Sequence, residues 1–116
     1  MFKVIIAGGR DFNDYDLVKS KLDNLLVNCD PVEIVSGTAR GADKLGELYA
    51  YRSQLPVALF PAKWHVYGKS AGYKRNAQMA DYADALVAFW DGKSRGTKHM
   101  IDLAKSAELE VCVVNY

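Results

Sequence analysis

The sequence predicts an α/β fold, a Rossmann-like three-layer sandwich in which about five parallel strands, in the order 3-2-1-4-5, carry helices on both faces. Three observations support this class. Short, β-rich apolar runs alternate with segments whose apolar residues recur at helical spacing. The runs are largely apolar throughout, as in parallel strands buried on both faces. The 116 residues contain no linker, repeat or low-complexity segment, which suits a single domain over residues 1–116.

The first strand and helix are predicted near the N-terminus. Residues 3–7 form an apolar run that is too short for a signal peptide, and the glycine-containing loop 8–12 follows it. Asn13 or Asp14 is suited to cap a helix that runs to about residue 28. The buried face of this helix is expected to consist of Val18, Leu22 and Leu25.

The second unit follows the helix-breaking pair Asp30-Pro31. Residues 32–35 are the second predicted strand, and the loop 36–43 leads into the next helix. The third strand is expected over residues 55–60, with Pro56 near its start, where a missing N–H donor is tolerated. One face of the helix is expected to consist of Ala42, Leu45, Leu48, Tyr49 and Arg52.

The second half begins with a long loop over residues 61–70. A helix is predicted from Ala71 to about Tyr82, and Arg75 and Asn76 in its first turns are expected to face a ligand instead of solvent. The remaining elements are predicted as a strand over 85–90, a loop over 91–96, a helix over 97–107 and a strand over 111–114. The buried face of the last helix is expected to consist of Thr97, Met100, Ile101 and Ala104.

The composition excludes several classes of protein. It is that of an ordinary globular domain, 50% apolar and 25% charged, and no apolar run approaches the ~20 residues of a membrane span. The net charge of +1 argues against a strongly basic nucleic-acid protein, although not against a local basic patch. Cys29 and Cys112 are far apart, which fits free thiols in a reducing cytoplasm. His65 and His99 are isolated, so no metal site and no cofactor is expected.

Glycine and charge collect in the four predicted βα connections, whereas the αβ connections contain little beyond turn residues. Parallel strands place their carboxyl ends at one edge of the sheet, so these loops are predicted to converge on one pocket. Cations beside helix N-termini favour a phosphate-bearing ligand, and the alternative is an ordinary solvated end of the domain. The cations of this rim are Arg10, Arg40, Lys44, Lys63, Lys69, Lys74, Arg75, Lys93, Arg95 and Lys98, and its acids are Asp11, Asp43 and Asp91.

Two of these loops carry most of the argument. In the loop 36–43, glycine allows backbone N–H groups to approach an anion, and Arg40 adds a guanidinium. The alternative is a strand-to-helix turn that Ser36 or Thr38 caps. Residues 91–97 combine glycine, hydroxyl and positive charge without matching the P-loop pattern, and residues 8–10 do not match the dinucleotide pattern.

Aromatic residues flank the long third loop. Trp64, Tyr67 and Tyr73 are suited either to stack on a base or to cover the core, and core cover is favoured for Trp64. Trp90, at the end of a buried strand, is expected to pack in the core.

The loops also follow one another in a known order. The chain contains GGRD at 8–11, GTARGAD at 37–43, AKW at 62–64, YGKSAGYKRNAQM at 67–79, AF at 88–89 and GKSRGT at 92–97. In these motifs it resembles, over nearly its whole length, the YspA-type, YpsA-related branch of the SLOG superfamily, or DUF2493. That superfamily relates to the DNA-processing protein DprA/Smf and to the lonely-guy (LOG) phosphoribohydrolases. The resemblance implies a Rossmann-like fold, a pocket for nucleotides or nucleotide-derived ligands, and a phosphate held by residues 92–97.

One departure from the resemblance concerns catalysis. LOG enzymes carry the motif P-G-G-x-G-T-x-x-E, whose glutamate supports glycosidic cleavage. When Gly96-Thr97 is aligned with the G-T of that motif, Met100 stands at the glutamate position and His99 precedes it. The sequence therefore leaves enzymatic activity undecided, and the candidate acids or bases are Asp11, Asp43 and Asp91.

Three functions are compatible with these residues. The first is a cytoplasmic domain that binds a nucleotide or nucleotide-derived phosphate ligand as a sensor, carrier or sequestering protein. The second is a nucleotide hydrolase or N-glycosidase, and the third is single-stranded nucleic-acid binding by the cationic rim, as in DprA. No membrane partner is expected, and monomer and homo-oligomer both stay open. The predicted ligand-binding residues are Gly8, Gly9, Arg10, Ser36, Gly37, Thr38, Arg40, Gly41, Asp43, Lys63, Trp64, Gly72, Arg75, Asn76, Asp91, Gly92, Ser94, Arg95, Gly96 and Thr97.

Overall fold

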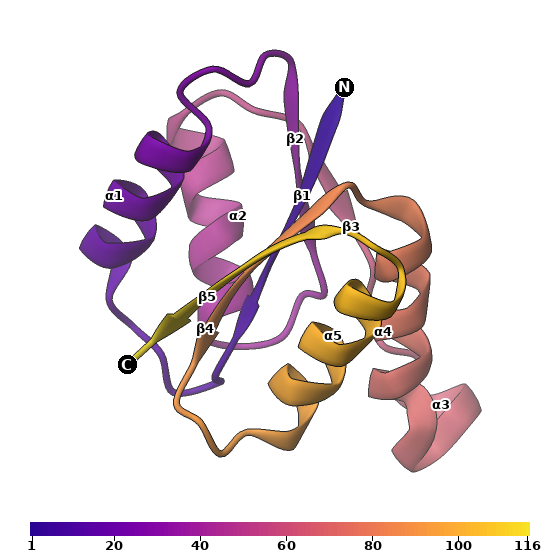
Figure 1. Cartoon of the computed structure of the whole chain (residues 1–116). Coiled ribbons are helices and arrows are strands. Elements are labelled where there is room, and N and C mark those ends of the chain that lie inside the picture. Colours follow the sequence, from indigo (N-terminus) through magenta and orange to yellow (C-terminus); the bar gives the residue numbers. More distant parts are fainter.

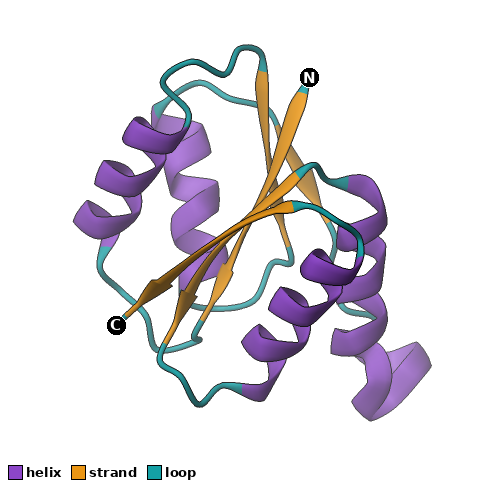
Figure 2. Cartoon of the chain, in the orientation of Figure 1, coloured by secondary structure: helices purple, strands orange, loops and turns teal.

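The computed structural model describes residues 1–116 as one parallel sheet between two layers of helices (Figures 1 and 2). The strand order is β3-β2-β1-β4-β5 and every pairing is parallel, so the predicted fold class is confirmed. Figure 1 shows α1 and α2 on one face of the sheet and α4 and α5 on the other. The elements are β1 Phe2–Gly8, α1 Tyr15–Leu25, β2 Val32–Ser36, α2 Ala42–Arg52, β3 Val57–Leu59, α3 Trp64–Tyr67, a 3₁₀ turn Gly68–Ser70, α4 Ala71–Tyr82, β4 Ala85–Trp90, α5 Arg95–Ser106 and β5 Glu110–Asn115.

The central strand β1 supplies side chains to both cores. Val4 and Ile6 pack in the cluster beneath α1 and α2, whereas Ile5 and Ala7 pack in the cluster beneath α4 and α5. This division arises because successive side chains of a strand point to opposite faces. Burial on both faces explains why residues 3–7 lack the polar alternation of a half-exposed strand.

The helix predictions hold for their buried faces, with one exception in α1. All four residues predicted for the buried face of α5 are buried, as are Val18 and Leu22 of α1. Asp14 caps α1, since its carboxylate accepts a hydrogen bond from the Leu17 N–H at 3.0 Å. The prediction for Leu25 was wrong: α1 ends there and Leu25 is exposed, while Leu26 turns in to pack against the core.

The third strand is shorter than predicted. It spans only residues 57–59 at the edge of the sheet, because the residues before it serve other contacts. The Leu55 N–H donates to the Ala50 carbonyl at the end of α2, and Gln54 adopts a left-handed φ of 57°. Pro56 has no N–H, and its carbonyl accepts a hydrogen bond from Ile34 in β2.

The loop predicted over residues 61–70 contains the short helix α3 and a 3₁₀ turn. The N–H groups of Val66 and Tyr67 both donate to the Lys63 carbonyl at 3.0 Å. Neither of these short elements has a buried residue, so the sequence contains no apolar periodicity from which they could have been predicted. In α5, the helix begins at Arg95, two residues earlier than predicted.

One aromatic side chain differs from its predicted place. Trp64 does not cover the core, since it is 50% exposed on α3. Arg52 lies at the exposed end of α2, where its guanidinium stands 4.8 Å from the centroid of the Tyr15 ring. Trp90 does pack against the core beneath α4 and α5, although only in part, and its indole N–H donates to the Ser94 carbonyl. None of the helices combines the length and the apolar character needed to cross a bilayer.

Candidate functional site

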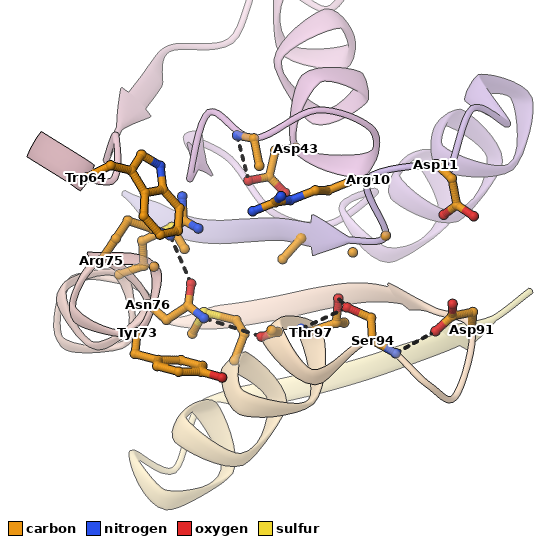
Figure 3. A pocket seen from close by; sticks show the side chains of 18 of the residues that line it. Arg10, Asp11, Asp43, Trp64, Tyr73, Arg75, Asn76, Asp91, Ser94 and Thr97 are labelled. Atoms are coloured by element: carbon orange, nitrogen blue, oxygen red, sulfur yellow. Dashed lines mark hydrogen bonds between the residues drawn. The ribbon is translucent and has the colours of Figure 1, made fainter. Parts of the chain in front are cut away.

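A cavity of about 460 Å³ lies at the carboxyl edge of the sheet. It opens where β1 and β4 are neighbours, and the helices that follow these two strands lie on opposite faces. This is the switch point of the fold, where open α/β sheets form a crevice. Figure 3 shows Arg10 and Asp43 on one side, Ser94 and Thr97 on the other, and Trp64 and Arg75 at one end. All four βα connections supply lining residues of this main cavity, as predicted.

The N-terminus of α5 forms one side of the main cavity. Ser94 is its N-cap, and its hydroxyl accepts from the Thr97 N–H at 3.4 Å and lies 3.1 Å from the Thr97 hydroxyl. Helix geometry leaves the N–H groups of Arg95 and Gly96, in the first turn, without an intrahelical acceptor. A Cβ built on Gly96 would meet no atom within 4 Å, so open space adjoins this turn. The turn has the form of an anion site.

The loop before α5 is held in one conformation by its own polar groups. The carboxylate of Asp91 accepts hydrogen bonds from the N–H groups of Ser94 at 2.9 Å and Lys93 at 2.8 Å, and these bonds lower the pKa of Asp91. Gly92 adopts φ +83°, which glycine tolerates best. The indole N–H of Trp90 donates a hydrogen bond to the Ser94 carbonyl at 3.1 Å. The first turn of α5 is therefore held in place by contacts of the protein itself.

Two backbone donors of the loop 36–43, on the opposite side, are engaged within the loop itself. The Thr38 N–H donates to the Ser36 hydroxyl, and the Ala39 N–H donates to the Asp43 carboxylate. The Ala42 N–H donates to the Gly9 carbonyl, and Gly41 is the N-cap residue of α2, which has no side-chain cap. Neither Ser36 nor Thr38 caps the helix. Three N–H groups of this segment, those of Thr38, Ala39 and Ala42, are therefore bonded to the protein itself.

The glycines of this side are explained by close packing. A Cβ on Gly41 would lie 2.1 Å from the Gly9 carbonyl oxygen, and the residue adopts φ +78°. A Cβ on Gly9 would lie 1.8 Å from the hydroxyl of the C-terminal Tyr116, and one on Gly37 would lie 2.6 Å from the Arg75 guanidinium. Sequence alone cannot separate such packing glycines from Gly96, whose Cβ direction is open.

Arg75 and Asn76 on α4 connect the two sides of the cavity. The Arg75 guanidinium donates to the Gly37 carbonyl and, at 3.0 Å, to the Asn76 side-chain oxygen. The Asn76 amide in turn donates to the Gly96 carbonyl at 3.3 Å and lies 3.2 Å from the His99 ring nitrogen. Both residues line the cavity, and no carboxylate lies within 4.0 Å of Arg75. Burial lowers the pKa of Arg75, and the charge of Asp43 opposes that shift.

The three candidate aspartates have different environments. Asp43 is 5% exposed, and burial raises its pKa to about 6 against the opposing effects of the Ala39 N–H and Arg75. The carboxylate of Asp91 is hydrogen-bonded to the N–H groups of Lys93 and Ser94 in its own loop. Asp11 lines the outer rim and accepts a hydrogen bond from the Tyr116 hydroxyl at 2.9 Å, and burial chiefly raises the pKa of Tyr116 to about 12. Only Asp43 combines burial in the cavity with a pKa near neutrality.

A second, open hollow of about 600 Å³ adjoins the main cavity and is called the side hollow below. Arg10, Ala39, Trp64 and Arg75 line both spaces. Gly37, Thr38, Arg40 and Ala62 line only the side hollow.

The predicted site residues divide into three groups. Those lining the main cavity are Gly8, Gly9, Arg10, Asp11, Asp43, Trp64, Gly72, Arg75, Asn76, Asp91, Ser94, Gly96 and Thr97. Those reaching only the side hollow are Gly37, Thr38 and Arg40. Those lining neither space are Ser36, Gly41, Lys63, Gly92 and Arg95.

Six further residues of the main cavity are absent from the list of predicted ligand-binding residues, although Lys69 was counted among the rim cations and Tyr73 among the aromatics suited to stack on a base: Ala7, Ala39, Lys69, Tyr73, Met79 and Met100. Helical spacing would have found two of them. Met79 lies four residues after Arg75, and Met100 lies three residues after Thr97, so each shares a face with a predicted site residue. Met100, which the sequence alignment sets at the glutamate position of the LOG motif, is buried and lines the main cavity.

The geometry defines a class of protein: a Rossmann-like domain with a polar cavity, edged by a helix N-terminus, at the switch point of its sheet. Residues 2–67 match the family of YspA, cpYpsA-related SLOG proteins. The chain is also 34% identical to the gene 61 protein of Mycobacterium phage D29 over 96% of its own length and 94% of that protein. The chain therefore belongs to the YspA, cpYpsA-related SLOG family.

A solved structure shares the fold. The structure of DNA processing protein A (DprA) from Streptococcus pneumoniae superimposes with a TM-score of 0.79 over 97% of this chain, at 16% sequence identity. The chain spans half the length of that DprA chain. The likeness shows that this domain has the fold of the SLOG superfamily.

Proposed function

We propose that the domain binds a nucleotide or nucleotide-derived phosphate ligand in the main cavity, as a sensor, carrier or sequestering protein. The observation that carries the proposal is the first turn of α5, where Gly96 leaves open space beside N–H groups that have no helical partner. The cavity of about 460 Å³ is within the range of small-ligand pockets.

The charge of the cavity supports an anionic ligand. Arg10, Lys69 and Arg75 line it, and none of them has a carboxylate within 4.0 Å, since the ion pairs of the fold all lie elsewhere. A phosphate would supply the missing negative partner through charge-assisted hydrogen bonds. Asp43 and Asp91 add acceptors suited to ribose hydroxyls.

Aromatic side chains supply the surface that a base requires. Trp64 and Tyr73 line the main cavity and are each about half exposed. The nearest approach of the Trp64 ring to the Cβ position of Gly72 is 3.4 Å, so the indole lies close against the first turn of α4. One face of a base would stack on such a ring. Membership of the SLOG family adds to the case for a nucleotide-like ligand.

The test compares phosphorylated and unphosphorylated ligands. Calorimetric titration with the common nucleoside monophosphates and their nucleosides is repeated on Arg75→Ala. We expect the substitution to weaken monophosphate binding by about 1.5–3 kcal/mol and nucleoside binding much less. The control is Arg52→Ala, which makes the same change at the far end of α2. Equal losses for both ligands together with lower stability would make Arg75 a structural link to Gly37 only.

A native mass spectrum of freshly purified protein complements the titration. A retained nucleotide would appear as an added mass that disappears on denaturation. If no nucleotide is retained and none binds at about 1 mM, a Kd that corresponds to only about 4 kcal/mol, the proposal is refuted.

Asp43 favours hydrolysis as a second candidate function. A buried carboxyl group whose pKa is about 6 is suited to general acid or base chemistry at neutral pH. Met100 supplies no carboxylate at the position of the LOG glutamate, so Asp43 would have to act in its place. Release of base or phosphate during long incubation with nucleotides, lost in Asp43→Asn, would establish this function.

A further inference from the structure

The side hollow is lined by three arginines that form no salt bridge. Arg10, Arg40 and Arg75 come from the loops after β1 and β2 and from α4, yet they surround one space. Each ion pair of the fold joins a lysine to a carboxylate, so no carboxylate lies within 4.0 Å of any of the three guanidinium groups. Three like charges at one hollow repel one another unless an anion lies among them.

The positions of these arginines are held by the fold. Arg75 is anchored by its bonds to Gly37 and Asn76, and its neighbour Arg10 is close enough to help lower its pKa. Arg40 follows a turn in which the Thr38 N–H donates to the Ser36 hydroxyl and the Ala39 N–H donates to the Asp43 carboxylate. Thr38 adopts a left-handed φ of 64° in this turn. These bonds hold the backbone on the N-terminal side of Arg40 in one conformation.

The two spaces offer different chemistry to an anion. The main cavity adjoins the backbone N–H groups in the first turn of α5, whereas the side hollow is lined by three guanidinium groups. Trp64 and Arg75 form the wall that the spaces share. A ligand lying along this wall would contact both anion sites at once.

We propose that the ligand carries two phosphates separated by a nucleoside, as in a nucleoside 3′,5′-bisphosphate or a dinucleotide. One phosphate lies at the N-terminus of α5, the nucleoside lies against Trp64, and the second phosphate lies among the arginines of the side hollow. This inference rests on the proposed function, because it requires that the main cavity bind the first phosphate.

The experiment uses ligands that differ in one phosphate. Calorimetry compares AMP, ADP and adenosine 3′,5′-bisphosphate, and the guanosine series is measured in parallel. ADP carries both phosphates on the same side of the nucleoside. It therefore controls for the added negative charge without placing a second phosphate on the other side of the nucleoside. We expect the 3′,5′-bisphosphate to bind about 10- to 100-fold more tightly than AMP, roughly the contribution of one charge-assisted hydrogen bond, and more tightly than ADP.

A substitution in the side hollow tests whether the tighter binding of the bisphosphate comes from contacts in that hollow. Arg40→Ala removes an exposed side chain that lines only the side hollow. It should abolish the advantage of the bisphosphate while AMP affinity stays within about twofold, because AMP does not reach that space. Arg52→Ala is the matched control and should change neither affinity.

The outcomes separate this inference from the proposed function. Binding of AMP with no gain for the bisphosphate, an equal gain for ADP, or an unaffected bisphosphate in Arg40→Ala would each overturn the inference alone. Failure of every nucleotide to bind would refute the proposed function and this inference with it. If a 12-mer of deoxythymidylate binds more tightly than the bisphosphate, and its affinity falls steeply with salt, the ligand of the site is single-stranded nucleic acid and the inference is overturned.

Discussion

Replacing Gly96 by valine separates ligand binding from folding more cleanly than any other change in the site. A side chain at position 96 would enter open space, since no atom lies within 4 Å of its Cβ position, and Gly96 does not adopt a left-handed φ. Valine is a slightly better helix former than glycine, so Gly96→Val should leave the free energy of unfolding unchanged or raise it by a few tenths of a kcal/mol.

The same side chain would fill the space in which we place the phosphate. Losing one charge-assisted hydrogen bond to the first turn of α5 removes about 1.5–3 kcal/mol, or roughly 10- to 150-fold in Kd. Gly96→Ala carries a smaller group and should give an intermediate loss. Lys105→Val adds the same valine to an exposed position in the last turn of α5 and should leave the affinity unchanged.

The assay pairs calorimetric titration of a nucleoside monophosphate with thermal unfolding of the same preparations. Unchanged melting temperature with weakened binding is the expected pattern. A large fall in melting temperature with unchanged affinity would show that Gly96 serves the fold, and the phosphate would then have to be placed elsewhere.

Two further predictions concern stability. Gly41→Ala should destabilise by about 2 kcal/mol or more in thermal unfolding, because its φ is +78° and its Cβ would lie 2.1 Å from the Gly9 carbonyl oxygen; an unchanged melting temperature would contradict this contact. Burial raises the folded-state pKa of Asp43 from 3.8 to about 6, so its contribution to stability falls as pH rises through this range, and the ionised group opposes folding above it. Asp43→Asn should therefore stabilise the protein near about pH 7.5, by up to about 3 kcal/mol because the pKa of about 6 already includes the attraction to Arg75, and have little effect near about pH 4. Destabilisation at both pH values would instead identify Asp43 and Arg75 as a stabilising pair.

The sequence predicted the sheet and the edge at which the cavity lies. Apolar runs that alternate with helical periodicity define βα units, and parallel strands connected by helices have their carboxyl ends together. The loops containing Arg10, Asp43, Trp64 and Gly96 therefore had to meet, whatever their detailed conformation. The buried face of α5 was predictable for a similar reason, since its apolar spacing is local.

Tertiary structure alone decided what each loop presents to that edge. The loop 36–43 and the first turn of α5 both contain glycine and hydroxyls, yet the N–H groups of Thr38, Ala39 and Ala42 bond to the protein itself, whereas open space adjoins the Cβ position of Gly96. The difference comes from partners distant in sequence: the Gly9 carbonyl accepts from Ala42, and Arg75 reaches the Gly37 carbonyl across 38 positions. The side hollow likewise exists only because three separate segments bring arginines together. Such contacts depend on side-chain reach and backbone direction after folding, and neither is encoded in the periodicity of any single segment.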